Sequence, residues 1–159
     1  MFNIGGNKYR LITSIHFNRG NMNRLELHHI SDIRIKEAWT LFQNGCFEGA
    51  YYLAGYSVEC GLKACIAKQI REHDFPDRKF IQDSYTHDLN KLLGLAGLRE
   101  EHLKKADKDK NFALNWAVVK DWSEEDRYSM QIQEQKTRDL IEAITDTNSG
   151  VLPWLKTFW

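Results

Sequence analysis

The stretch CFEGAYYLAGYSVECGLKACIAKQIREHD, residues 46–74, decides the fold, because it is long and contains no proline. Apolar residues recur in it at strict four-residue intervals, at Ala50, Ala54, Val58, Leu62 and Ile66. Residues four apart lie on one face of an α-helix, so this series predicts a helix. Other apolar and aromatic residues extend that face over most of the circumference: Tyr51, Leu53, Cys65 and Ala67. A helix that is apolar on most sides is the central helix of a bundle.

The flanking residues predict further helices. Pro76 and Pro153 are the two prolines of the 159-residue chain, which favours long helical segments. Before the central helix, we expect a helix over residues 33–45, with Ser31 or Asp32 as its N-cap and Gly45 as its end. After it, we expect these elements in order: a loop over 73–84, a short helix over 88–97, one or two polar helices over 98–122, a capped turn over 123–129, an amphipathic helix over 130–147, with Leu140, Ile141 and Ile144 facing inward, and a short apolar hook over 151–159. The sequence therefore predicts an all-α fold, an antiparallel helical bundle of about five helices.

The first 21 residues differ from this pattern. Gly5, Gly6 and Asn7 form a turn signal, and the residues after them alternate between apolar and polar as a strand does. We therefore expect a short β-like N-terminal appendage over residues 1–21, followed by a helical domain over residues 22–159.

The composition excludes several classes of protein. The 22 Lys and Arg balance the 22 Asp and Glu, so the chain lacks the overall positive field of a dedicated duplex binder. The composition does not exclude a local basic groove. No apolar run approaches the roughly 20 residues that span a bilayer, and the N-terminus lacks a signal-peptide core. We expect a cytoplasmic protein with no membrane partner.

The three cysteines indicate free thiols. Cys46, Cys60 and Cys65 are odd in number, and the last two lie in the apolar stretch. Five residues turn a helix through about 140°, so Cys60 and Cys65 point apart. There is no CxxC and no HExxH pattern. We expect no metal site and no cofactor.

Two polar groups stand out. His87 lies between Thr86 and Asp88, where we expect Ser84 or Thr86 to cap the following helix, Asp88 to sit in its first turn and the imidazole to bond a neighbouring loop. A role for His87 in chemistry is the alternative.

Glu59 and Lys63 are spaced as an i, i+4 ion pair on a helix that is otherwise apolar. They form either an exposed pair or a partly buried one. Arg127 is then a partner for Glu59 or a ligand for an anion. We expect Trp116, Trp122 and Tyr128 to form core or groove wall, with stacking on bases as the alternative.

Four segments in order resemble the HEPN family, the higher-eukaryote-and-prokaryote nucleotide-binding domains. AWTLFQNGCFEGAYYLAGYSVECGLKACIAK is similar to the family's first two helices, and YTHDLNKLLGLAG to its THDL signature. NWAVVKDWSEEDRY and GVLPWLKTFW resemble later parts of one bacterial branch. The resemblance covers residues 22–159. It implies a homodimeric helical bundle and a link to RNA or nucleotides, in toxin–antitoxin or phage-defence systems.

The resemblance also sets two functional hypotheses. Many members are metal-independent ribonucleases that carry Arg, four to six residues, then His on a late helix. This chain has Arg127 there but no following His; the spacing occurs instead at Arg24–His29 and Arg10–His16. The favoured hypothesis is a non-catalytic or atypical binding protein, with Glu59, Lys63, Asp88, Trp122 and Tyr128 as ligand-binding residues and a nucleotidyltransferase-like or antitoxin partner. The alternative is a ribonuclease toxin whose catalytic residues are His87 and Arg127.

Residues 2–17, FNIGGNKYRLITSIHF, resemble the middle strands of the HigB family of mRNA-interferase toxins. The match covers a fragment of that fold. It implies a remnant of a neighbouring toxin gene or an upstream start codon, which suits a toxin–antitoxin or defence locus.

Overall fold

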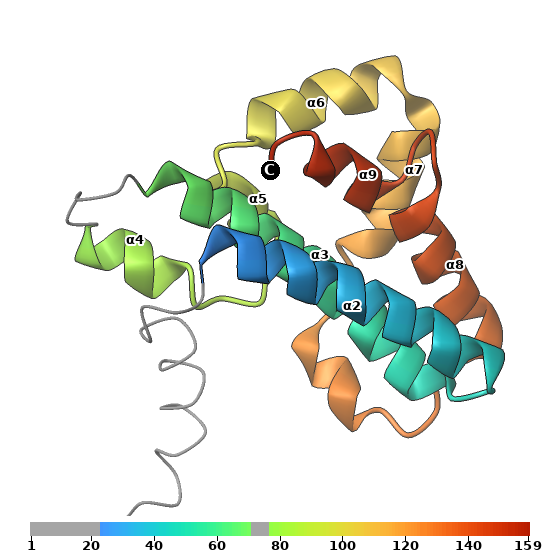
Figure 1. The fold of residues 1–159 in the computed structure, drawn as a ribbon. Coiled ribbons are helices and arrows are strands. Elements are labelled where there is room, and N and C mark those ends of the chain that lie inside the picture. The colour runs from blue at the N-terminus through green and yellow to red at the C-terminus, as the bar shows by residue number, and fades with distance from the viewer. Residues whose placement is uncertain (1–22, 71–76) are drawn as a thin grey trace, which may run out of the picture.

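The computed structural model describes residues 23–70 and 77–159 (Figure 1). These residues form eight α-helices and one 3-10 turn, with no strand among them, which confirms the all-α prediction. The elements are α2 (Arg24–Gln43), α3 (Phe47–Gln69), α4 (Arg78–Asp83), α5 (Leu89–Leu95), α6 (Arg99–Lys108), α7 (Lys110–Val119), η1 (Glu124–Tyr128), α8 (Glu134–Thr145) and α9 (Val151–Lys156). The predicted appendage over residues 1–21 lies outside the described residues.

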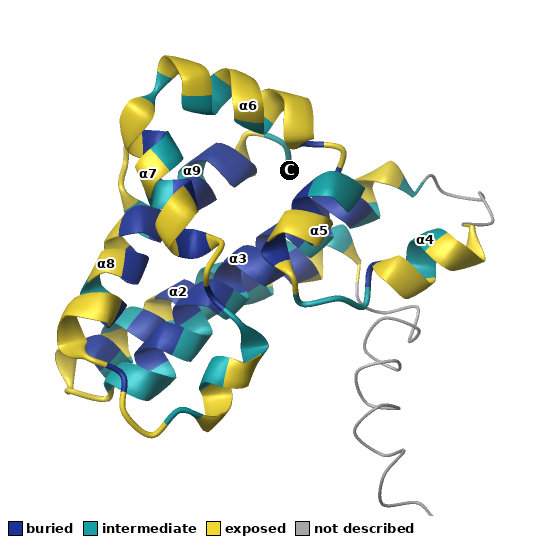
Figure 2. Ribbon diagram, turned by 180° about the vertical axis from the view of Figure 1, so that it is seen from behind, coloured by how far each residue is buried: buried dark blue, intermediate teal, exposed yellow. Residues whose placement is uncertain are grey.

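Helix α3 is the centre of the bundle, as predicted. Its four-residue series, Ala50, Ala54, Val58, Leu62 and Ile66, is fully buried. The short connection after α2 turns the chain back on itself, so α2 and α3 run antiparallel side by side (Figure 1). Helices α5, α8 and α9 and the turn η1 cover the other sides of α3, most of which is buried (Figure 2). Each large aliphatic side chain removed from water here stabilises the fold by about 1.5–3 kcal/mol.

Helix α2 begins earlier than predicted. Asn23 is its N-cap and forms a reciprocal capping box with Glu26, so the predicted caps Ser31 and Asp32 are wrong. Ser31 is fully buried, and its hydroxyl donates a 2.7 Å hydrogen bond to the carbonyl oxygen of Ser57 in α3. Gly45 has a φ of +75°, a left-handed conformation that glycine adopts without strain, and it ends α2 as predicted.

The segments after α3 differ from the prediction in several places: α4 lies in the predicted loop, α8 begins at Glu134 and the predicted hook contains the helix α9, so the described residues form eight helices instead of about five. The predicted loop contains a short helix, α4, whose N-cap Asp77 accepts a hydrogen bond from the Phe80 amide. The polar stretch forms two helices, α6 and α7, which meet at Asp109. The turn η1 is capped by Ser123, and α8 buries Leu140, Ile141 and Ile144, as predicted. Helix α9 and the residues after it form the apolar end of the chain.

No described helix is both long enough and apolar enough to cross a membrane. All three cysteines are free; Cys60 and Cys65 are buried, whereas Cys46 is exposed. Across residues 23–70 and 77–159, no three His, Cys, Asp or Glu side chains gather as ligands for a metal ion.

Candidate functional site

A buried carboxylate that contacts one lysine and one histidine lies at the middle of α3. Glu59 is 1% exposed. Its Oε1 lies 2.7 Å from Nζ of Lys63, one helical turn further along α3. Nδ1 of His87 lies 3.0 Å from each carboxylate oxygen. The Lys63 side chain is 12% exposed, so the partly buried form of the predicted ion pair is the correct one.

His87 reaches Glu59 from the loop that joins α4 to α5. Asp88 is itself the N-cap of α5, because its carboxylate accepts a hydrogen bond from the Lys91 amide. The expected cap, Ser84 or Thr86, is therefore wrong, as is the placement of Asp88 in the first turn. Ser84 donates instead to the carbonyl of Ile81. The expected bond from the imidazole to a neighbouring loop is also wrong, because the ring contacts the central helix.

The surroundings of Glu59 fix the tautomer of His87. Burial alone would raise the pKa of Glu59, but the hydrogen bond from His87 and the charge of Lys63 outweigh burial, so the pKa lies below its ordinary value. The carboxylate is therefore ionised and accepts, so Nδ1 of His87 is the donor. In the neutral imidazole this leaves Nε2 as a hydrogen-bond acceptor and proton acceptor. The His87 side chain is 35% exposed, so solvent and small ligands reach the ring.

The exposed part of the ring faces a hollow of about 330 Å³, hereafter the His87 hollow. One wall is the start of α5, and the other is the segment between α7 and η1. The lining combines cationic, anionic and hydroxyl side chains with one indole: Thr86, His87, Asp88, Leu89, Asn90, Lys120, Trp122, Ser123 and Glu124. Such a set suits a ligand that both accepts and donates hydrogen bonds.

Trp122 forms the apolar wall of this hollow. It is 3% exposed, and its indole lies directly on Gly55 of α3, where a Cβ atom would be 2.2 Å from the ring. Glycine at position 55 therefore permits the close approach that fixes the wall. The prediction of a core or groove-wall residue is confirmed for Trp122 and for Trp116, which is 5% exposed. Because so little of either ring is accessible, stacking of a base on them is the wrong alternative.

Arg127 does not contact Glu59, so that predicted partnership is wrong. Its guanidinium lies 4.7 Å from the ring centroid of Tyr128, which is 69% exposed. Within residues 23–70 and 77–159, no carboxylate forms an ion pair with Arg127. Tyr52 lies next to Trp122, with ring centroids 6.1 Å apart, and its hydroxyl is one of the groups that raise the pKa of Arg127, after that of Tyr128. Arg127 and Tyr128 therefore form an exposed cation and ring outside the lining of the hollow, and the prediction of Tyr128 as core or groove wall is wrong.

Three of the sequence-predicted site residues line the His87 hollow together: His87, Asp88 and Trp122. Glu59 and Lys63 lie behind His87, whereas Arg127 and Tyr128 stand outside the lining. Lys120 and Glu124 were missed. Their positions two residues before and two after Trp122 were the available signal. In comparisons with known proteins, no family model, no curated protein and no solved structure matches the chain.

Proposed function

We propose that the protein binds RNA or a nucleotide in the His87 hollow, as a HEPN-like protein of a toxin–antitoxin or phage-defence system. One observation carries the proposal: a buried carboxylate holds His87 from behind while the ring is exposed to the hollow. The start of α5 does not need this arrangement, because Asp88 already caps the helix. Burying a charged group is costly unless it is paired. The buried contacts of Glu59 with Lys63 and His87 therefore indicate a role other than starting helix α5.

The lining chemistry supports a nucleotide as the ligand. Lys120 and the hydroxyls of Thr86 and Ser123 are donors suited to phosphate oxygens. The carboxylates of Asp88 and Glu124 accept hydrogen bonds from ribose hydroxyls or base amino groups. Outside the lining, in η1, the exposed Tyr128 ring and its guanidinium neighbour offer a platform on which a base stacks.

The homodimer and the nucleotidyltransferase-like or antitoxin partner rest on the HEPN resemblance. The apolar circumference of α3 is not evidence for a dimer, because elements of the same chain cover it. The dimer stays a prediction, and the mass in solution decides it.

A metal-independent ribonuclease is the second candidate, favoured by the contact between Glu59 and His87. A carboxylate behind a histidine orients the ring and stabilises its protonated form, which suits a general base. Nε2 of His87 would take the proton of an RNA 2′-hydroxyl as that oxygen attacks the adjacent phosphorus. The bond to the 5′-oxygen then breaks, and Lys120 is the proton donor available in the hollow. Arg127 lies outside the lining, so it would stabilise the charge of a phosphate on a strand that extends past the Trp122 wall.

One assay separates the two candidates. Wild-type protein and the variants His87→Ala and Arg127→Ala are incubated with structured RNA in EDTA, and binding and cleavage are read on gels. For the binding protein, we expect a retarded complex without cleavage, and weaker binding in Arg127→Ala by about 1–3 kcal/mol, typical for a lost charge-assisted contact. Arg138→Ala is the matched control, because that guanidinium also lies over a ring, 4.8 Å from the Phe42 centroid.

Cleavage by the wild type that disappears in His87→Ala would establish the ribonuclease instead. Cleavage that survives in His87→Ala would remove His87 from any catalytic role. Absence of both binding and cleavage in the wild type would refute the proposed function. Circular dichroism of each variant confirms that a lost activity is not a lost fold.

A further inference from the structure

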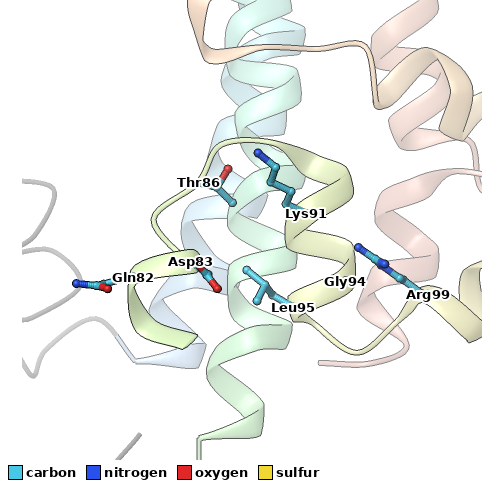
Figure 3. Close-up of a pocket in the computed structure, with 7 residues that line it drawn as sticks. All are labelled: Gln82, Asp83, Thr86, Lys91, Gly94, Leu95 and Arg99. Atoms are coloured by element: carbon cyan, nitrogen blue, oxygen red, sulfur yellow. The ribbon is translucent and has the colours of Figure 1, made fainter. Parts of the chain in front are cut away.

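A second hollow of about 610 Å³ lies beside the His87 hollow, between α4 and α5 (Figure 3). Thr86 lines both hollows, so they adjoin at this residue. The lining comes from α4, the loop after it, α5 and the start of α6: Gln82, Asp83, Thr86, Lys91, Gly94, Leu95 and Arg99. It contains two cations and one carboxylate, and is therefore more positive than the His87 hollow.

Arg99 is held in this hollow by the absence of a side chain at Gly94. A Cβ atom at position 94 would lie 2.6 Å from Nε and 2.7 Å from a terminal nitrogen of Arg99. Glycine therefore lets the guanidinium lie directly against α5, as Figure 3 shows. Arg99 forms no ion pair within the described part of the chain, so its donors are available to a ligand. A planar guanidinium with free donors suits two oxygens of one phosphate.

Lys91 supplies the second cation, on the side of the hollow nearer Thr86 (Figure 3). Its nearest carboxylate is that of Asp88, with Nζ 3.7 Å from Oδ2, and the Lys91 side chain is 70% exposed. Such a long, exposed pair contributes little stability, so Lys91 is free to turn towards a stronger anion.

We infer that Lys91 and Arg99 bind a backbone phosphate, so that the ligand is an RNA strand rather than a mononucleotide. This inference rests on the proposed function of the His87 hollow. His87 precedes α5, whereas the guanidinium of Arg99 lies against Gly94, five residues after the first residue of that helix, which at about 1.5 Å each is about 7.5 Å along the axis. A single phosphate group is smaller than this separation, whereas successive phosphates of one strand span it. The strand passes Thr86, which lines both hollows.

The test is fluorescence anisotropy with a labelled single-stranded RNA of about eight nucleotides, within the usual site size of single-strand binders. Unlabelled adenosine monophosphate serves as a competing ligand for the His87 hollow. Arg99→Ala is expected to weaken RNA binding about tenfold and to lower the slope of log K against log salt by about 0.7, one single-strand phosphate contact. The affinity for the mononucleotide should not change.

Two further variants make the test specific. Gly94→Ala keeps every charge but displaces the guanidinium, so it should weaken RNA binding as Arg99→Ala does. Lys104→Ala removes an exposed, paired lysine of the same helix as Arg99 and should leave binding unchanged.

The two proposals fail in different ways. If RNA binding depends on His87 but is the same in Arg99→Ala as in the wild type, the strand inference is overturned and the proposed function stands. If Arg99→Ala weakens mononucleotide and strand equally, Arg99 belongs to the His87 hollow and the strand inference is likewise overturned. A wild-type protein that binds neither ligand overturns the proposed function and this inference with it.

Discussion

The contact between Gly55 and Trp122 gives a sharp test of how the candidate site is built. In Gly55→Ala, the new methyl group would lie 2.2–2.3 Å from three atoms of the indole. Ordinary contacts between such carbons are about 3.5–4.0 Å, so the ring must move by more than 1 Å. The substitution therefore pushes the wall of the His87 hollow away from α3.

One stabilising and two destabilising terms set the size of the effect. Alanine in place of glycine inside a helix stabilises by about 1 kcal/mol. Overpacking a well-packed core costs about 1–3 kcal/mol, and Trp122 also loses part of its burial, at about 25 cal/mol for each Å² re-exposed. We expect the overpacking and the lost burial of Trp122 to outweigh the gain in helix propensity. The free energy of unfolding should therefore fall by about 2 kcal/mol.

Urea denaturation followed by tryptophan fluorescence and circular dichroism measures this change, with Gly61→Ala as the matched control on the same helix. There the new Cβ would lie 3.3–3.6 Å from flexible side-chain atoms, so we expect a change between zero and a gain of about 1 kcal/mol. In a Trp122→Ala background, Gly55→Ala should no longer destabilise. An equal loss in both backgrounds would refute the steric reasoning, as would a Gly55→Ala variant as stable as the wild type.

Three further outcomes follow from the structure. Glu59→Gln leaves the largely buried ammonium of Lys63 without a carboxylate partner, so urea denaturation should show a fall of about 3 kcal/mol in the free energy of unfolding; a fall under 1 kcal/mol would mean that the pair is solvated. Burial lowers the pKa of His102 below 6.5 in the folded state, so the unfolded chain binds more protons and this histidine costs stability as pH falls below about 6.5. His102→Phe should therefore flatten the fall of melting temperature between pH 7 and 5, and an unchanged slope would contradict this. A chain that starts at Met22 keeps the Asn23 cap of α2, so its melting temperature should equal that of the full chain; a loss of several degrees would show that residues 1–21 belong to the core.

The bundle was predictable because its central signal is local. The apolar series of α3 repeats once per turn, and each member is buried in the structure. The start of α2 was not predictable in the same way. Ser31 is as good a capping residue by type as Asn23, and what excludes it is a hydrogen bond to Ser57, a contact that exists once α2 and α3 have packed.

In the candidate site, too, the local contacts were predictable from the sequence and the long-range contacts were not. The pair of Glu59 and Lys63 follows from helical spacing and was predicted. The contact of His87 with Glu59 joins residues 28 apart in sequence, across a loop whose path no local pattern determines. The sequence suggested Glu59 as a partner for Arg127. In the folded chain, however, Arg127 contacts Tyr128, and Glu59 contacts His87 and Lys63.

The central claim is that a nucleic acid ligand occupies the hollow in front of His87, and the ring nitrogens of His87 report on this directly. The measurement is a titration of ¹⁵N-labelled protein with single-stranded RNA in EDTA, followed through the imidazole resonances, with His87 assigned by the signal missing in His87→Gln. We predict a saturable shift of the Nε2 resonance of His87, while the exposed His29 of α2 stays unchanged. RNA that binds without moving the His87 resonances, or that does not bind, would contradict the account.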